Sequence, residues 1–537
     1  MNVNLLYKDR EWSSAGSYFD YNSVTKDLGL KAIFNAASTD SITRMGGTAV
    51  TSFDPYLGLS VKRVMGVPLK TKEEIGYRQE IMQDCFKKQS MTDSLYRISK
   101  TVLDEWEKLG RKNNSIGEIG TKAKLITDLK VLKLLYDGIA LIKKIFSENA
   151  ETLQSEGLKS LYDRLENEFS EEKTEQLEAL IDSVSFFADI YGNSRELDSF
   201  SVRVPRIKIE CGLMDGLKIG DLKLDELETV VMKYNKQYGI GSRVKGKISS
   251  LTPGVISLYK DQAIQEDAEA IEFLVVSHVY SYCTSFVSML GAFFDQFHFQ
   301  IAFYLGAINF KAALQNCKIE FCFPVAEDAE DCLEYDELKE PVLSMEIKGK
   351  TVGNTGRLSG KQLVVITGAN QGGKSTFLRS LGVSQLLMQC GMVVPAKRFK
   401  SSIHTSVFTH FTRREDSAMN SGRLDEELRR MDRIVSNLDK DSLILLNESF
   451  ATTTEKDGSR IAYGIIKALK EHGVRIYTVT HLLSFAQQTY KESASDEKVC
   501  FMCAEHLDNG KRTYKIIPHE PEMTSFGLEL YDEVLGS

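Results

Sequence analysis

The stretch that decides the fold is Gln362–Thr376, which reads QLVVITGANQGGKST. Its first six residues form a mostly apolar run that predicts a buried strand, and Thr376–Leu387 has the composition of a helix. Between them, Gly368–Ser375 follows the pattern GxxxxGKS, whose glycines let backbone N–H groups converge on phosphate. The helix N-terminus adds positive potential, Lys374 neutralises the β and γ oxygens, and Ser375 would place its hydroxyl on Mg²⁺. A glycine turn that merely precedes a helix is the alternative interpretation.

Two further apolar runs end in side chains suited to hydrolysis. Ser442–Leu446 (SLILL) is followed by Asn447 and Glu448. In P-loop ATPases the first acidic residue at this strand end holds the Mg²⁺ shell and the next orients the attacking water. The amide at the first position still accepts from a metal-bound water, but without charge it would lower metal affinity roughly 10- to 100-fold, whereas Glu448 is the predicted general base. Val474–Thr480 (VRIYTVT) ends in His481, which we expect to reach the γ-phosphate or the attacking water. Taken alone, either side chain is also explained as an ordinary strand-end residue.

Three motifs taken together resemble one known family. GANQGGKST, LILLNES and VTH are similar to the ATPase domain of MutS proteins, whose phosphate loop reads GPNMGGKST. The resemblance implies an α/β P-loop ATPase domain of the ABC type, a mixed sheet flanked by helices, preceded by a mainly α-helical core and lever domain. It also implies that Asn370 contacts the γ-phosphate. The residues implied to bind ATP and Mg²⁺ are Gly368, Ala369, Asn370, Gln371, Gly372, Gly373, Lys374, Ser375 and Thr376.

The resemblance implies two contributions from outside the loop. Asn420–Arg423 opens a predicted helix with Ser421 at its cap and carboxylates in its first turn. In relatives this helix end faces the nucleotide of the opposite subunit, so Ser421 would complete the catalytic site in trans within a homodimer. A plain capped surface helix is the alternative, because Leu424–Glu427 replaces the family's serine-threonine-phenylalanine. Asn354 matches the adenine-side segment, in which Thr351 stands where the family has a stacking aromatic residue.

The region before the phosphate loop is predicted to form long helices. Leu69–Val204 contains no proline, and from Lys122 onward apolar residues recur at helical spacing. A strand-like alternation begins at Ser201, so we expect a small β element near residues 200–220 and a further helical run after it. The uncharged stretch Phe273–Phe294 meets the length test for a membrane span. Its serines and the polar residues that follow favour a helix buried between protein layers instead.

Length and local composition predict two domains. The chain has 537 residues, of which 42% are apolar and 26% charged, enough for more than one sizeable core. An acidic connector at residues 327–340 marks a boundary near 330. We expect residues 1–330 to form a mainly helical MutS core-like and lever-like region. Residues 331–537 are expected to form a MutS-like P-loop ATPase and dimerisation domain.

Charge and cysteines limit the class of protein. A formal net charge of −8 and a pI near 5.7 exclude a uniformly basic surface, so any nucleic-acid contact would be local. Nine cysteines and no apolar leader in Met1–Arg10 predict a reducing, cytoplasmic location without disulfides. Cys500 and Cys503 have CxxC spacing, but in a strand their sulfurs would point to opposite faces. Zinc would also need further ligands, so structural cysteines are the better interpretation.

The resemblance implies an ATP-dependent DNA-binding protein. ATP binding and hydrolysis at a dimer interface would gate a clamp of helical arms on duplex or branched DNA, in DNA repair or recombination as in the mismatch-repair family. Repair proteins are further partners that this implies, and no membrane association is expected. We find no Phe-x-Glu in the first forty residues, so we expect a short member without the mismatch-recognition domain. Because the sequence stops at residue 537, we also expect no Smr domain. The alternative is a nucleotide-gated protein scaffold with weak ATPase activity and no direct DNA binding.

Overall fold

The computed structural model of the protein describes residues 2–13, 20–45, 48–114, 121–170, 199–214, 218–235, 262–328, 331–412, 422–506 and 512–521. The chain forms two compact units, each built from several stretches of sequence. One contains Met1–Asn2, Arg97–Ala150 and Ser160–His298, and the other contains Val3–Tyr96, Glu151–Lys159 and Phe299–Ser537. The division of the sequence near residue 330 stays a prediction.

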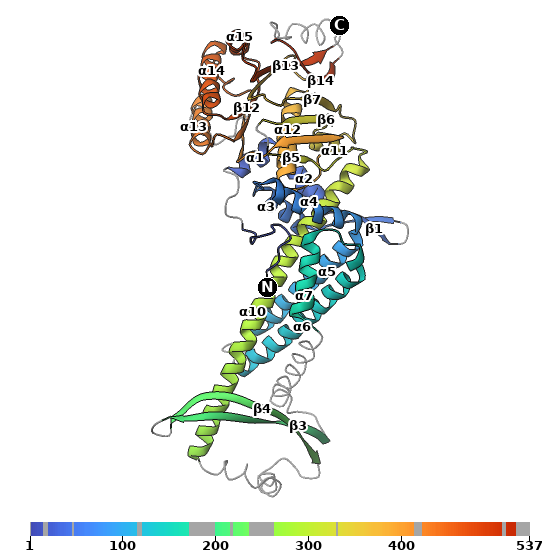
Figure 1. Cartoon of the computed structure of the whole chain (residues 1–537), viewed down its shortest axis with the longest axis vertical. Coiled ribbons are helices and arrows are strands. Elements are labelled where there is room, and N and C mark those ends of the chain that lie inside the picture. Colours follow the sequence, from blue (N-terminus) through green and yellow to red (C-terminus); the bar gives the residue numbers. More distant parts are fainter. Residues whose placement is uncertain are drawn as a thin grey trace. The chain divides into compact units, whose positions relative to one another are not determined.

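The first unit is built mainly from long helices (Figure 1). Glycine lets two of them approach closely: a Cβ on Gly138 would lie 2.8 Å from Cζ of Phe294. The rings of Phe293 and Phe297 stack at 5.6 Å in the same buried layer. The elements that lie wholly or partly in this unit are α5 (Gln89–Asn114), α6 (Thr121–Asn149), η1 (Ala150–Thr152), α7 (Glu156–Glu168), β3 (Ser199–Met214), β4 (Lys218–Asn235) and α10 (Gln262–Asn316).

The β element of this unit is larger than the sequence predicts. β3 and β4 form a two-stranded antiparallel sheet whose register runs from Ser199–Asn235 to Met214–Lys218. The helical run expected after residue 220 is therefore wrong, because β4 occupies that stretch. Residues such as leucine, glutamate and lysine favour helix locally, but pairing with an adjacent strand outweighs such weak preferences. Residues 215–217, which connect the two strands, lie outside the described residues.

The uncharged stretch Phe273–Phe294 lies within α10, but where its burial is described, from Tyr280 onward, only one face is buried, so the expectation of a helix buried between protein layers holds for that face alone. Near its end Leu290 and Phe294 are fully buried, whereas Phe286 is 45% exposed. Among the described residues, no helix combines the length and the hydropathy that a membrane crossing needs.

The second unit joins a mainly helical N-terminal part, which contains a two-stranded antiparallel sheet, to two larger sheets (Figure 1). Arg78 is fully buried in this part and donates from Nη2 to the Leu6 carbonyl at 2.8 Å and from Nη1 to the Cys390 carbonyl at 3.2 Å. It thereby ties α4 (Lys72–Lys87) to the C-terminal end of α12 (Lys374–Gln389). The N-terminal elements are α1 (Tyr21–Asp27), α2 (Lys31–Ser38), β1 (Thr39–Met45), β2 (Thr48–Phe53), α3 (Pro55–Met65) and α4 (Lys72–Lys87).

A mixed six-stranded sheet forms the centre of this unit. Its order is β10-β11-β12-β8-β13-β14, with all neighbours parallel except the antiparallel pair β13 and β14. The predicted α/β fold class with mixed sheets is confirmed. The strands are β8 (Leu363–Thr367), β10 (Val407–Phe411), β11 (Leu443–Asn447), β12 (Arg475–Val479), β13 (Val499–His506) and β14 (Arg512–Pro518). The helices after β8 are α12 (Lys374–Gln389), α13 (Arg423–Val435), α14 (Glu455–Glu471) and α15 (Leu483–Glu492).

Alternation along β11 explains why helices pack on both faces of this sheet. Ile444 and Leu446 belong to the buried cluster that includes residues of α13, α14 and α15. Leu445 points the other way, since a Cβ on Gly382 of α12 would lie 2.4 Å from its Cδ1. A smaller sheet of order β5-β9-β6-β7 borders the site described below. Its strands and the adjoining helix are β5 (Val325–Glu327), β6 (Leu333–Leu338), α11 (Pro341–Glu346), β7 (Asn354–Arg357) and β9 (Arg398–Ser402).

Candidate active site

The predicted phosphate loop joins β8 directly to α12. β8 ends at Thr367 and α12 begins at Lys374, so six residues form the connection. Gly373 occupies the N-cap position with φ of 91°, a conformation that residues with a Cβ rarely adopt. Gly372 is required for space, because a Cβ there would lie 2.6 Å from Cβ of Ala504 on β13. The loop therefore presents the N-terminal N–H groups of α12 at the end of the parallel strands, an arrangement suited to an anion.

Lys374 and Ser375 lie at the start of α12. The side chain of Lys374 is buried, and its Nζ donates to the carbonyls of Gly368 at 2.6 Å and Ala369 at 2.8 Å. The Ser375 hydroxyl donates to Oδ1 of Asn447 at the end of β11, at 2.7 Å. The two residues that the sequence predicts to serve the metal are therefore in direct contact.

Glu448 and His481 form the second predicted pair. Nδ1 of His481 lies 3.6 Å from Oε1 of Glu448, although the two residues follow different strands. The interaction with His481 lowers the pKa of Glu448, against the opposing effect of partial burial, and nearby Lys374 lowers it further. The interaction with Glu448 raises the pKa of His481, while desolvation and Lys374 oppose that rise. Both shifts favour a carboxylate beside an imidazolium.

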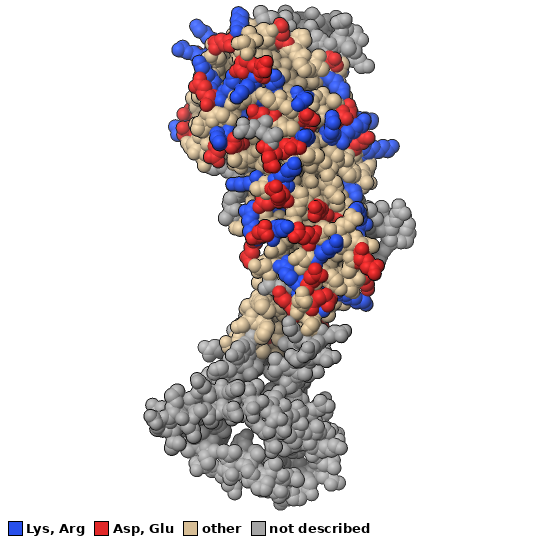
Figure 2. All heavy atoms as spheres, in the orientation of Figure 1, with Lys and Arg blue, Asp and Glu red and all other residues tan. Residues whose placement is uncertain are grey.

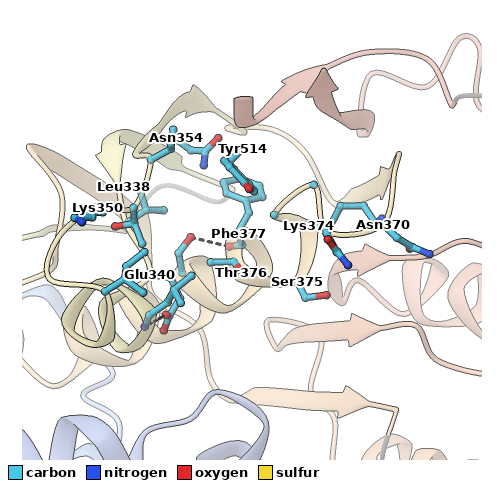
Figure 3. Close-up of a pocket in the computed structure, with 18 of the residues that line it drawn as sticks. Leu338, Glu340, Lys350, Asn354, Asn370, Lys374, Ser375, Thr376, Phe377 and Tyr514 are labelled. Carbon is cyan, nitrogen blue, oxygen red and sulfur yellow. Dashed lines mark hydrogen bonds between the residues drawn. The ribbon is translucent and has the colours of Figure 1, made fainter. Parts of the chain in front are cut away.

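Lys374, Ser375 and Glu448 border a cavity of about 550 Å³, within the range of small-molecule sites. At one end Asn370, Lys374 and Ser375 line it with polar groups, and Glu448 also contributes to the wall (Figure 3). Away from the loop the lining combines apolar side chains with Glu340 and Lys350 (Figure 3), so the cavity suits a ligand with a charged part and a flat, less polar part. The apolar lining residues are Leu338, Leu343, Ile347, Val352, Phe377 and Tyr514.

Tyr514 is a site residue that the sequence reasoning missed. It lies on β14, lines the cavity and is 49% exposed (Figure 3). Its φ is 59°, an uncommon conformation for a bulky residue and a frequent sign of a functional position. A Cβ added to Gly373, 141 residues earlier in the chain, would lie 3.7 Å from the Cβ of Tyr514. The available signal was an aromatic residue within the stretch Arg512–Pro518, but nothing local connects it with the phosphate loop.

Asn354 lines the same cavity and is the first residue of β7. Its Oδ1 accepts from the backbone N–H of Ile516 at 2.8 Å, so it also joins β7 to β14. Thr351 lines the cavity too, and its Oγ1 lies 2.5 Å from Oγ of Ser344. The segment predicted to face the base is therefore beside the apolar lining of the cavity.

The remaining predicted residues are placed as follows. Gln371, Gly372, Gly373 and Thr376 line the cavity. Gly368 and Ala369 are not part of the lining, and their carbonyls accept from Lys374. His481 and Asn447 reach the site through Glu448 and Ser375. Ser421 lies outside the described residues. The expected helix begins at Arg423 with Gly422 at its N-cap, so the predicted cap at Ser421 is wrong by one position; Asp425 and Glu426 occupy its first turn.

The cysteine pair is part of the sheet. Cys503 is buried on β13, where its Sγ lies 3.0 Å from Oγ1 of Thr367 and 3.3 Å from the carbonyl of Glu520. Cys500 is only partly buried. In the part of the chain that the structure describes, no group of three histidine, cysteine or acidic residues is arranged to hold a metal ion.

Comparison with known proteins gives two family matches. Residues 364–534 match the model of MutS domain V, a P-loop ATPase domain, and residues 70–198 match that of the MutS2 N-terminal domain. The first match begins in β8 and contains the phosphate loop, Asn447, Glu448 and His481.

Curated relatives carry the same family name. The chain is 24% identical over 310 residues to the DNA mismatch repair protein MutS of Desulfatibacillum aliphaticivorans, covering 54% of this chain and 34% of the relative. It is 36% identical over 123 residues to the protein of that name from Thermotoga neapolitana, covering 23% of this chain and 15% of the relative. A third match, the protein of the same name from Thermotoga sp. strain RQ2, is 30% identical over 170 residues, covering 32% of this chain and 21% of the relative. The chain thus spans about a third or less of these relatives.

Proposed function

Because the chain belongs to the MutS family, we propose that it is an ATP-hydrolysing, DNA-binding protein of DNA repair or recombination. Two copies would enclose ATP at their interface, and binding and hydrolysis would open and close helical arms around DNA. The observation that carries the proposal is the convergence of two pairs, Ser375 with Asn447 and Glu448 with His481, beside Lys374.

The residues present fit a magnesium nucleotide. The oxygens of Ser375 and Asn447 are hard ligands of the kind that Mg²⁺ and its waters prefer. Magnesium would neutralise charge on the phosphates that the loop N–H groups and Lys374 bind. Glu448 would orient a water and accept its proton, since its lowered pKa keeps it ionised at neutral pH. His481 would hold that carboxylate in place and balance its charge.

Nucleotide binding is tested first. The purified full chain should retain labelled ATP in the presence of Mg²⁺ and increase in mass to that of a dimer, and Lys374→Ala should abolish retention. Glu448→Gln should leave binding intact and slow hydrolysis roughly 10²- to 10³-fold, the loss expected for a positioned catalytic group. Hydrolysis by Glu448→Gln at the unmodified rate would contradict the assignment. Completion of the site by Ser421 from the second copy is part of the same proposal.

DNA binding is tested by its salt dependence. Figure 2 shows basic and acidic side chains interspersed over the described part of one face, so contact with DNA rests on the family rather than on a charged patch seen there. A clamp should bind duplex or branched DNA with an affinity that falls steeply as salt rises and that changes with ATP. The rival is a nucleotide-gated scaffold with weak hydrolysis, which the amide at Asn447 favours. It should show nucleotide-dependent dimerisation and no such salt slope.

A further inference from the structure

The turn that carries Glu448 has an unusual backbone. Glu448 and Phe450 both have positive φ, 56° and 66°, although neither is glycine. Conformations of this kind each cost on the order of 1–3 kcal/mol and persist only where surrounding contacts determine them. The position of the carboxylate therefore depends on whatever holds the turn.

A buried carboxylate from α13 is one of the groups that hold it. Glu427 is 5% exposed, and its Oε2 accepts from the backbone N–H of Phe450 at 3.0 Å and from the Thr452 hydroxyl at 3.1 Å. Burial raises the pKa of Glu427, and the bonds from Thr452 and Phe450 oppose that rise. Glu427 lies outside the lining of the nucleotide cavity, so it has no direct contact to make with a ligand there.

β10 supports the same turn from beside α13. Nδ1 of His410 lies 2.7 Å from Oγ of Ser449, and Nε2 lies 3.1 Å from the carbonyl of Glu427. The imidazole also stacks on the Phe450 ring, with centroids 5.4 Å apart. α13, β10 and the turn after Glu448 therefore form one hydrogen-bonded assembly, in which Glu427 supplies the side-chain bonds from α13 to the turn.

We propose that Glu427 is a positioning residue for ATP hydrolysis, which places Glu448 by fixing the backbone at Phe450 and couples its position to that of α13. This rests on the proposed function, in which Glu448 is the base. A displacement of α13 would pull on the Phe450 N–H through Glu427 and move the carboxylate two residues earlier. Sub-ångström control of such a group matters, since a shift of about 1 Å can cost 10²-fold in rate.

The test is a double-mutant cycle in the full chain. Glu427→Leu removes the acceptor but keeps similar volume, and Glu427→Gln keeps an acceptor oxygen. We expect Glu427→Leu to lower kcat about 10- to 100-fold with the ATP Kd unchanged, and Glu427→Gln to restore a rate within about threefold of the parent. In a Glu448→Gln background, Glu427→Leu should lower kcat no further, because both substitutions impair the same function, that of the Glu448 carboxylate. Asp432→Ala, an exposed carboxylate on the same helix, is the control and should leave kcat unchanged.

Each outcome decides the question. The proposal is overturned if Glu427→Leu keeps the parental kcat, if it weakens ATP binding instead of turnover, or if it lowers the rate equally with and without Glu448→Gln. A Glu448→Gln variant of unmodified rate would refute the proposed base itself, which separates the two failures. If Glu427→Leu fails to fold, Glu427→Asp, whose carboxylate is one methylene further from Phe450, takes its place in the cycle with the same expectations.

Discussion

Asn447→Asp would restore the charge that the metal site lacks. The amide accepts the Ser375 hydroxyl at 2.7 Å, and aspartate has the same shape and an oxygen in the same position, so the substitution changes charge without removing the bond. A charged acceptor makes that bond roughly twice as strong. From the usual effect of such outer ligands we expect Mg²⁺ affinity to rise about 10- to 100-fold, which corresponds to about 1.4–2.8 kcal/mol.

The assay is a Mg²⁺ titration of steady-state ATP hydrolysis. The Mg²⁺ concentration that gives half the maximal rate should fall about 10- to 100-fold. The new carboxylate adjoins Glu448 and should raise its pKa, since like charges disfavour ionisation, so the acid limb of the rate profile should move to higher pH. Asn437→Asp adds the same charge at an exposed position and should leave the titration unchanged. Coincident titration curves for Asn447→Asp and the parent would refute the reasoning.

Three further predictions follow from the structure. His481→Gln removes the main cause that lowers the pKa of Glu448, so the acid limb of hydrolysis should shift to higher pH; the pH–rate profile measures this, and an unmoved limb would contradict the pairing. Tyr514→Ala removes an aromatic face from the apolar lining of the cavity and should weaken ATP binding by about 1–3 kcal/mol, while affinity for inorganic triphosphate stays constant in calorimetry. On α14, Gly458→Ala would place a Cβ 2.5 Å from the backbone carbonyl oxygen of Phe450 and should destabilise the protein by about 1–3 kcal/mol. Gly464→Ala meets open space and should stabilise it by about 0.5–1 kcal/mol. Melting temperatures that change in the same direction for both variants would contradict this prediction.

The pair of Glu448 and His481 also implies a pH window. The folded pKa of Glu448 is lowered, so its contribution to stability is present above the unfolded value and is lost as pH falls through the folded one. The folded pKa of His481 is raised, so its contribution is complete below the unfolded value and is lost as pH rises through the folded one. The mutual stabilisation is therefore greatest between the unfolded pKa of Glu448 and the unfolded pKa of His481.

Much of the site could be predicted from residues that are close in sequence. Gly368–Ser375 was recognisable because phosphate binding requires strand, glycines, lysine and helix within one short segment, and β8 and α12 have the expected positions. The position of Asn447 at the end of β11 and that of His481 shortly after β12 were predictable for the same reason, since each follows an apolar run.

Other features depended on contacts between distant segments. A helical run was expected where β4 forms, because local composition does not report the pairing with β3. Tyr514 and Glu427 could not be assigned from their neighbours, since their roles arise from a cavity wall and from the backbone N–H of Phe450.

The sequence by itself determined the chemistry available to this protein: a phosphate loop, a carboxylate and a histidine at the ends of buried strands, and an amide where a second carboxylate is usual. The tertiary structure decided which of these groups meet and what holds them. Local patterns encode strand, turn and helix because the backbone responds to residues a few positions away. Distances such as that between Glu448 and His481 are set by packing of the whole sheet, so only the folded chain contains them.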